Sequence, residues 1–169
     1  MTDLRENLAA WSSANCSIAR AMDVVGSRSA MLIMRDALLG TRRFDDFVRR
    51  VGIGEPAMAA RLKDLVAAGL LERIPYREPG QRTRHEYQLT RKGRELLPVL
   101  TALRSWGDTW AADDAGPPVL ATHRGCGHPV RVALRCAQGH DVTGGDIELV
   151  AGPGLIRNTA EDRQDGPEL

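Results

Sequence analysis

The sequence predicts a mainly α-helical (α+β) fold, on three observations. Residues 44–69 repeat apolar residues at helical spacing in two short segments separated by a turn. Residues 71–89 hold two short alternating runs around a Pro-Gly turn. Residues 91–110 carry a longer apolar helical pattern. The order helix, turn, helix and β-hairpin predicts a winged helix-turn-helix domain, which the other helices would hold or pair.

Two helices are expected before this unit. Residues 18–25 place apolar residues at helical spacing ahead of Gly26, a common helix stop. Residues 28–40 are apolar around most of the circumference and predict a central buried helix. Its apolar residues are Met31, Leu32, Met34, Ala37, Leu38 and Leu39. A further short helix over residues 3–12 would align Leu4, Leu8 and Trp11.

The helix-turn-helix begins at Phe44. Its first helix has an inner face made of Phe44, Phe47, Val48 and Val51. After a turn at Ile53-Gly54, Pro56 opens the second helix, because an early proline loses no intrahelical hydrogen bond. This second helix ends at Gly69, and its buried stripe is Met58, Leu62, Leu65 and Val66.

The wing follows as strands over residues 71–76 and 84–89, joined by a basic loop around Pro79-Gly80. Thr90 can cap the next helix, and Pro98 inside it predicts a bend or a break. That helix carries a broad apolar face: Leu96, Leu97, Leu100, Leu103, Trp106 and Trp110. Because one small domain would not cover so much apolar surface, we expect a subunit interface there.

The net charge of +1 is distributed unevenly along the chain. Residues 20–104 carry 17 Arg and Lys against 10 Asp and Glu, a net of +7, whereas residues 105–169 carry −5. A basic middle favours a polyanionic partner. The alternative is an ordinary set of arginine-rich, solvated helix surfaces.

The middle segment contains the candidate DNA contacts. Ala57 and Ala60 lie opposite the buried stripe, where small side chains permit approach to base edges and thymine methyls in the major groove. Arg82 and Arg84 can reach phosphates or an adjacent minor groove. The full set is Arg43, Ala57, Ala60, Arg61, Lys63, Arg82, Arg84 and His85. Taken singly, each piece could instead be a solvated helix edge or a plain exposed hairpin.

Other classes of function find less support. The chain has no glycine-rich phosphate loop and no nucleophile elbow, so we do not expect an enzyme. The alternative is a winged-helix module that binds protein and does not bind DNA. The basic middle segment argues against it, because a protein-binding face need not be basic. The first 17 residues show neither a signal peptide nor a membrane anchor, which favours a cytoplasmic protein with reduced cysteines.

Residues 16–110 resemble the HxlR-type winged-helix regulators, which are relatives of the MarR proteins. The matching features are Cys16 ahead of IARAMDVVG, MLIMRDALLG followed by Arg43-Phe44, RLKDLVAAGLLER, and EYQLTRKGRELLPVL with Trp106-Gly107 behind it. The resemblance implies a homodimer paired through its terminal helices, which binds a palindromic operator in double-stranded DNA. We expect a sequence-specific transcriptional regulator, with repression as its main action. A small-molecule effector between the winged domain and the dimer helices would parallel the MarR relatives.

The chain departs from the family pattern at three places. Gly26-Ser27-Arg28-Ser29 lacks the usual Lys-Trp pair, and Ser17 stands where proline usually follows the cysteine. Ala59-Ala60 replace polar residues ahead of Arg61. Specificity is therefore expected to depend on thymine-methyl contact, Arg61 and DNA shape.

Some HxlR-type proteins sense electrophiles or oxidants through the cysteine that Cys16 matches. A cysteine at a helix N-terminus has its thiolate stabilised by the helix dipole, and Arg20 lies one turn further on. Redox sensing by Cys16 is thus one hypothesis. The alternative is an inert cysteine buried at a dimer interface.

The composition changes after residue 115. We expect a winged domain with dimerisation helices over residues 1–115, a small β appendage like a zinc ribbon over residues 116–150, and a flexible tail over residues 151–169. The appendage carries five N and S donors within 18 residues: His123, Cys126, His128, Cys136 and His140. A tetrahedral zinc site would use Cys126, Cys136, His140 and His123 or His128. Because no CxxC pair is present, a ribbon without metal is favoured, and no cofactor is expected.

Overall fold

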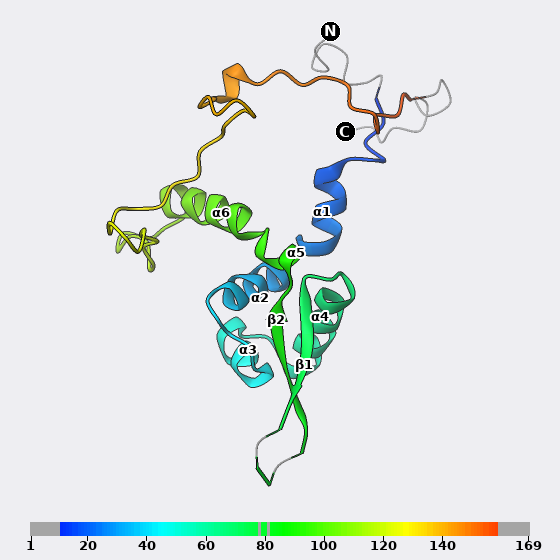
Figure 1. Cartoon of the computed structure of the whole chain (residues 1–169), viewed down its shortest axis with the longest axis vertical. Helices are drawn as coiled ribbons and strands as arrows, with labels where there is room; N and C mark the ends of the chain where they lie inside the picture. The colour runs from blue at the N-terminus through cyan, green and yellow to red at the C-terminus, as the bar shows by residue number, and fades with distance from the viewer. Residues whose placement is uncertain (1–10, 78, 81, 159–169) are drawn as a thin grey trace. The chain divides into compact units, whose positions relative to one another are not determined.

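The computed structural model describes residues 11–77, 79–80 and 82–158 (Figure 1). The chain divides into two compact units, one of residues Val24–Val132 and one of Met1–Asp23 with Ala133–Leu169. In chain order the elements are α1 (Ser17–Val25), α2 (Arg28–Leu38), α3 (Phe44–Val51), α4 (Glu55–Ala67), β1 (Leu71–Tyr76), β2 (Arg84–Leu89), α5 (Arg91–Arg94), α6 (Leu97–Trp110) and the short 3-10 helix η2 (Gly144–Asp146).

These bounds confirm the predicted fold class. Helices α3 and α4 form the helix-turn-helix, and β1 and β2 form the wing over the predicted residues. The predicted break falls between α5 and α6, just before Pro98. Figure 1 shows α2, α3 and α4 around the base of the hairpin, which extends beyond them. Among the described helices, none has the length and apolarity needed to cross a membrane.

The helix expected over residues 3–12 falls almost wholly, with Leu4 and Leu8, outside the described residues. At its described end, Trp11 pairs with Arg157 in an isolated β-bridge. The guanidinium of Arg157 also lies over the Trp11 ring, with Cζ 5.1 Å from the ring centroid. This end of the expected helix is therefore held by a bridge and a cation–π contact.

Helix α2 is the central buried helix, as predicted. The Ser27 hydroxyl caps it by accepting a hydrogen bond from the Ala30 amide at 3.1 Å. Ile33 and Met34 are fully buried. The helix thus forms the middle of the core.

The end of α2 corrects one expectation. Leu39 belongs to the apolar pattern expected around this helix, yet 63% of it is exposed. The helix ends at Leu38, and Gly40 adopts a left-handed φ of 96°. The chain therefore turns towards α3 before the apolar pattern finishes.

Two glycines end the paired helices. Gly52 has a φ of 72°, and its amide donates to the Val48 carbonyl at 3.1 Å, which closes α3. Gly69 also has a φ of 72°, and it follows α4. Its amide and that of Leu70 donate to carbonyls in the last turn of α4. This Schellman-type end requires a residue that tolerates positive φ, and glycine does so without strain.

The core lies between α2, α3, α4 and the base of the wing. It contains the buried residues predicted for the helix-turn-helix: Phe47, Val51, Met58, Leu62 and Leu65. Phe47 meets Tyr87 of β2 edge to face, with ring centroids 6.3 Å apart. This aromatic contact anchors the wing to the helices.

The wing is an antiparallel pair of strands, and the segment before α3 lies against the outer edge of β2. The strands β1 and β2 pair over their whole length. On the outer side of β2, the Tyr87 amide donates to the Arg42 carbonyl at 2.8 Å, and Arg43 bridges to Glu86. These contacts fasten the segment before α3 to the wing.

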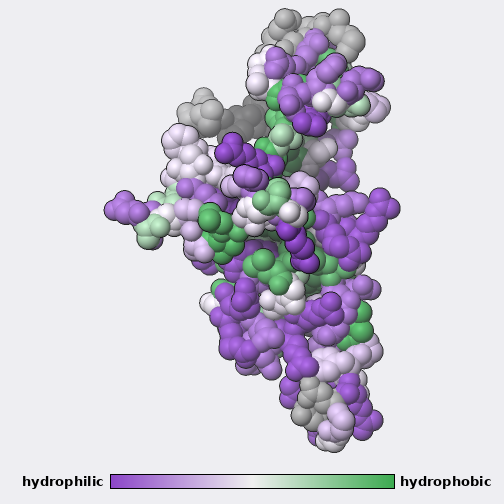
Figure 2. Space-filling model, turned by 60° about the vertical axis from the view of Figure 1, so that its left-hand side comes forward, coloured by the Kyte–Doolittle hydropathy of each residue, from purple (hydrophilic) through white to green (hydrophobic). Residues whose placement is uncertain are grey.

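The helices after the wing have caps and one tight contact. The Thr90 hydroxyl accepts a hydrogen bond from the Gly93 amide at 3.1 Å, as the predicted cap requires. Gly93 packs closely, since a Cβ at this position would lie 2.2 Å from the Leu70 carbonyl oxygen. No residue of α6 is fully buried by the other residues that the structure describes. Hydrophobic residues gather in the middle of the face seen in Figure 2, whereas the hairpin end is hydrophilic.

The residues after α6 form turns closed by single bridges. In one unit Thr122 pairs with Pro129, and in the other Arg135 pairs with Asp141. The short β runs expected over residues 119–150 are reduced to such bridges. No layer of the described chain covers their apolar side chains, so Val130, Val132 and Leu134 remain exposed.

Candidate nucleic-acid interface

Helix α4 turns one face to the core and the opposite face to solvent. Met58, Leu62 and Leu65 are buried, whereas Ala57 and Ala60 are exposed. Alanine side chains project little from a helix, so a groove edge can approach the backbone of α4 along this face. The two alanines therefore occupy the surface on which the sequence places base contacts.

Two cations flank the alanines. Lys63 is exposed. Arg61 is half-buried, with its Nη1 3.3 Å from Oδ2 of Asp64 on the same helix. Its Nε is buried, and no described residue accepts a hydrogen bond from it. The Arg61 guanidinium is thus folded back along α4 and would have to leave Asp64 to reach a base.

The wing carries the two arginines that the sequence places there. Arg82 is exposed beside the tip. Arg84 has its Nη1 3.9 Å from Oδ2 of Asp45 on α3, and both side chains are largely exposed. Ion pairs between exposed side chains are weak. The Arg84 guanidinium can therefore exchange this partner for a phosphate.

His85 has a neighbour that the sequence analysis does not single out. Its Nδ1 lies 2.9 Å from Nη2 of Arg73 on β1. The hollow beside the start of α3 is lined by Phe44, Asp45, Arg73, Tyr76, Arg84, His85 and Tyr87. Antiparallel pairing of the two predicted strands would have brought Arg73 close to His85, so the signal for Arg73 was present in the sequence.

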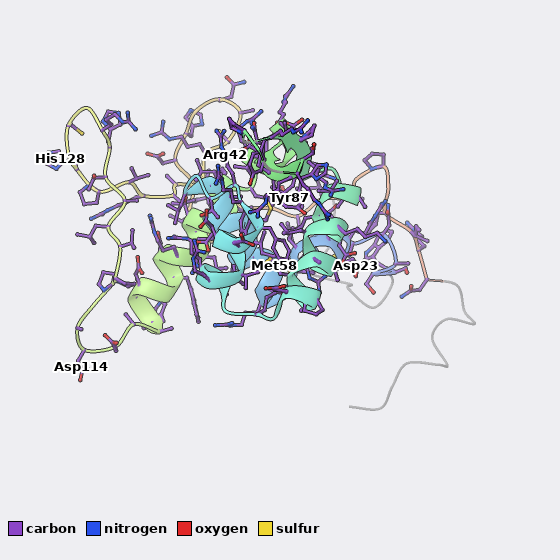
Figure 3. All side chains as sticks on the ribbon, turned by 90° about the horizontal axis from the view of Figure 1, so that it is seen from below. Asp23, Arg42, Met58, Tyr87, Asp114 and His128 are labelled. Atoms are coloured by element: carbon purple, nitrogen blue, oxygen red, sulfur yellow. The ribbon has the colours of Figure 1, made fainter. Side chains whose placement is uncertain are left out.

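Arg43 lies where α3 meets the wing. It is the N-cap residue of α3, and its Cζ lies 4.9 Å from the centroid of the Tyr76 ring. Figure 3, seen from the hairpin end, shows Arg42 and Tyr87 beside the wing and Met58 among the helices. The guanidinium of Arg43 thus braces the wing against the helix-turn-helix.

Cys16 lies directly before α1 and is half-buried. Its carbonyl accepts a hydrogen bond from the Arg20 amide at 3.0 Å. The Arg20 guanidinium donates to Oδ1 of Asn15 at 2.8 Å. The cation expected to support a Cys16 thiolate is therefore engaged with the Asn15 side chain.

The cysteines and histidines of the C-terminal part lie in two separate turns. In the first, His123 Nδ1 is 3.2 Å from the Cys126 sulfur. In the second, the backbone amides of Gln138, His140 and Gly139 donate to Cys136, which lowers the pKa of its thiol. Within the part of the chain that the structure describes, no group of three or more His, Cys, Asp and Glu residues could hold a metal ion. The sequence analysis favours a ribbon without metal over the zinc set of Cys126, Cys136, His140 and His123, and that choice stays a prediction.

Comparisons with known proteins agree with this architecture. An HTH-type transcriptional regulator of Mycobacterium tuberculosis is 38% identical over 140 residues, which cover 82% of this chain and 87% of the relative. The crystal structure of PA1607, a candidate transcription factor, is 36% identical and superposes with a TM-score of 0.73 over 82% of this chain and 96% of that one. The redox regulator HypR in its oxidised form is 26% identical, with a TM-score of 0.53 over 58% of this chain and all (100%) of its own.

The family comparison extends over the same elements. The model of the HxlR-like helix-turn-helix family matches residues 24–115. The match runs through α2, the helix-turn-helix, the wing and α6. Because the family and the named relatives are transcriptional regulators, an enzymatic activity is not the expectation for this chain. The chain belongs to the HxlR-like helix-turn-helix family of transcriptional regulators.

Proposed function

We propose that this protein binds a palindromic operator in double-stranded DNA as a homodimer and acts mainly as a repressor. The observation that carries the proposal is the exposed face of α4, where Ala57 and Ala60 lie opposite a fully buried stripe and beside the cationic Arg61 and Lys63. In this arrangement α4 enters the major groove, which is wide enough for one helix.

The two kinds of contact have different tasks. Arg82, Arg84 and Lys63 neutralise phosphates, which supplies affinity and makes binding depend on salt. Arg43, whose guanidinium lies over the Tyr76 ring, and His85, on strand β2 of the wing, add to this basic surface. Arg61 reads a base edge after it separates from Asp64, and the alanines contact thymine methyls.

A stripe on α6 supports the homodimer. Val99, Leu103, Trp106 and Trp110 recur at intervals of four, three and four residues, and each is at least half exposed. Such spacing places apolar side chains along one side of a helix, as in paired helices. Two copies joined by a twofold axis would present two α4 helices to two half-sites one DNA turn apart.

Redox control through Cys16 is the regulatory part of the proposal. HypR, which matches this chain in fold, is named as a redox regulator. The position of Cys16 before α1 and its partial exposure allow an oxidant to reach the sulfur. Oxidation there would alter α1, which leads in the sequence into α2, the helix that packs against the helix-turn-helix.

The test is fluorescence anisotropy with the DNA upstream of the protein's own gene and with a shuffled duplex. The titrations are run at several salt concentrations, with and without reductant. We expect tighter binding to the upstream DNA and a change when reductant is removed. A Cys16→Ser variant should keep the binding and lose the redox response. If neither duplex binds at low salt, the proposal is wrong and a protein-interaction module is the better assignment.

A further inference from the structure

The exposed stripe of α4 contains one acidic residue. The stripe follows the helix at intervals of three, four and three residues, and its members are all exposed: Ala57, Ala60, Asp64 and Ala67. In the proposed complex this stripe faces the major groove, where the phosphates of both strands repel a carboxylate. The Asp64 carboxylate is therefore unfavourable on DNA unless a hydrogen-bond donor meets it there.

The position of Asp64 on α4 is within reach of base edges. Four residues stand at positions i, i+3, i+4 and i+7 of this helix: Ala57, Ala60, Arg61 and Asp64. The recognition helix of homeodomains reads bases from four positions with the same spacing. Because residues at this spacing share one side of a helix, a groove that receives the two alanines also receives Asp64.

The contact between Arg61 and Asp64 is weak. Nη1 of Arg61 lies 3.3 Å from Oδ2 of Asp64, which is longer than a typical N–H···O hydrogen bond. The Asp64 side chain is 62% exposed, and ion pairs at exposed positions contribute little. The same arrangement leaves Nε of Arg61 buried with no acceptor among the described residues. Both side chains can therefore exchange this contact for better partners.

Cytosine and guanine are the bases that suit the two separated side chains. The carboxylate of Asp64 only accepts hydrogen bonds, and the N4 amino group of cytosine donates one in the major groove. The guanidinium of Arg61 only donates, and O6 and N7 of guanine both accept. Adenine places the acceptor N7 beside its amino group, and thymine presents an acceptor and a methyl group, so neither base suits a carboxylate.

We propose that Asp64 accepts a hydrogen bond from a cytosine in each half-site of the operator and thereby releases Arg61 to a guanine. This contact rests on the proposed operator binding and specifies part of the sequence that is read. The two residues are separated by about 4.5 Å along α4, which is close to the base-pair step of about 3.4 Å, so the two bases belong to neighbouring base pairs.

The exchange of partners also discriminates against other sequences. Where the DNA offers no donor to Asp64, separation of the pair leaves its carboxylate facing base acceptors and phosphates. The pair then stays closed, and Arg61 makes no base contact. Asp64 is therefore a specificity-determining residue, which lowers the affinity for random DNA and permits tight binding only where cytosine and guanine are neighbours.

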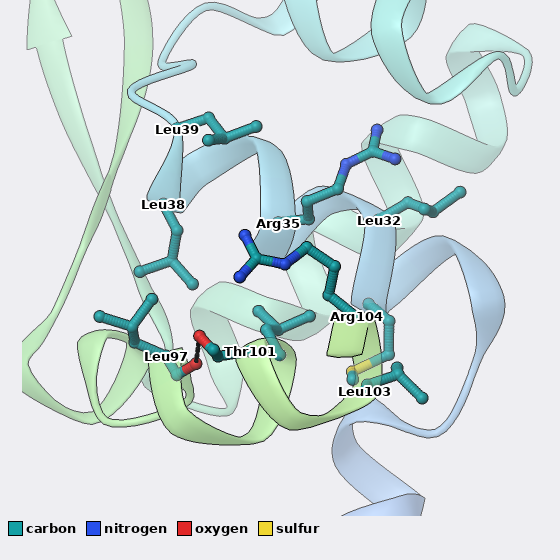
Figure 4. A pocket seen from close by; sticks show the side chains of 10 residues that line it. Leu32, Arg35, Leu38, Leu39, Leu97, Thr101, Leu103 and Arg104 are labelled. Atoms are coloured by element: carbon teal, nitrogen blue, oxygen red, sulfur yellow. Dashed lines mark hydrogen bonds between the residues drawn. The ribbon is translucent and has the colours of Figure 1, made fainter. Parts of the chain in front are cut away.

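A matched control lies on α6. Arg104 and Asp108 form another Arg–Asp pair within one helix, with 3.8 Å between Nε and Oδ2. Figure 4 shows Arg104 directed from α6 towards α2, in a space that Leu32 and Leu97 also line. None of the described residues that line this space belongs to α4. Asp108→Asn thus makes the same chemical change as Asp64→Asn outside the proposed DNA-reading helix.

The test is selection of binding sites from a randomised duplex library with wild-type protein, Asp64→Asn and Asp108→Asn. Wild-type protein and Asp108→Asn should enrich the same palindromic motif, with the cytosine and the guanine at neighbouring positions of each half. Asp64→Asn should keep the guanine and replace the cytosine by adenine, because an amide accepts from N6 and donates to N7. Anisotropy with two duplexes that differ only at this position should show a preference of about tenfold for cytosine in wild-type protein and the reverse preference in Asp64→Asn.

A second variant removes the contact without replacing it. Asp64→Ala should lose the preference for cytosine, gain none for adenine and bind shuffled DNA more tightly than wild-type protein. If the library yields no motif with wild-type protein, sequence-specific binding itself is wrong, and the cytosine contact with it. If wild-type protein and folded Asp64→Asn enrich the same motif, the regulator stands and the role of Asp64 is overturned. A change to any base other than adenine also overturns the cytosine contact.

Discussion

The guanidinium of Arg50 on α3 reaches the buried carboxylate of Asp36 on α2, with 3.3 Å between Nη2 and Oδ1. Arg35 binds the same oxygen at 3.1 Å, and within the described chain Oδ2 has no hydrogen-bond partner. The Asp36 side chain is fully buried, whereas both arginines are about half exposed. This carboxylate therefore links the central helix to the first helix of the helix-turn-helix.

We expect Asp36→Asn to destabilise the fold by about 1–3 kcal/mol, because two charge-assisted contacts are lost while the exposed arginines regain water. Urea denaturation followed by circular dichroism measures the change. Asp64→Asn is the control, since its exposed pair with Arg61 is worth at most about 1 kcal/mol. Equal losses in the two variants would contradict a special role for the buried carboxylate.

Gly93→Ala should be strongly unfavourable. The added Cβ would lie 2.2 Å from the Leu70 carbonyl oxygen, so the start of α5 must move away from the turn after α4. We expect a loss of about 1–3 kcal/mol in the free energy of unfolding. Gly107→Ala is the matched control in α6, where no described atom lies within 4 Å of the new Cβ. That variant should gain about 0.5–1 kcal/mol, because alanine favours the helix.

Arg82→Ala and Arg61→Ala should affect DNA binding differently. Arg82 is expected to contact phosphate, so its loss should weaken binding to all sequences alike and flatten the salt slope by about one. Arg61 is expected to read a base, so its loss should reduce the preference for the operator by about 1–3 kcal/mol. Anisotropy titrations against operator and shuffled DNA separate the two effects. Identical behaviour of the variants would disprove the division of roles.

Trp106→Glu should convert the dimer to a monomer. The substitution places a charge in the middle of the exposed stripe on α6, where it would have to be buried without a partner. Size-exclusion chromatography with light scattering reports the mass. Ser105→Glu is the control, because residue 105 is partly exposed on the same helix and none of its neighbours three or four residues away belongs to the stripe. A wild-type monomer, or a dimeric Trp106→Glu variant, would place the interface elsewhere.

Cys136 should react with iodoacetamide at lower pH than an ordinary cysteine. Backbone amides lower the pKa of its thiol, so the thiolate is present at a pH where a free cysteine is still protonated. The rate of alkylation against pH, measured in a Cys16→Ser/Cys126→Ser variant, gives the midpoint. A midpoint at or above that of cysteine in a short peptide would show that the turn does not hold the thiolate.

Much of the fold follows from local patterns. The strands of the wing occupy the predicted residues. Both signals for them, the alternation of apolar and polar residues and the Pro79-Gly80 turn, depend only on residues close in the sequence. Thr90 caps the next helix, and the chain breaks ahead of Pro98, since both effects depend on neighbouring backbone groups. The placement of Ala57 opposite Met58 and Leu62 likewise needs only the helical period.

Contacts between distant residues depend on tertiary packing. Asp36 is an ordinary acidic residue in the sequence, and only the packing of α3 against α2 buries it and brings Arg50 to its oxygen. The helices, the wing and the small-residue face of α4 depend on local periodicity, so sequence patterns are sufficient to predict them. The burial of the Asp36 carboxylate depends instead on how helices from different parts of the chain pack together.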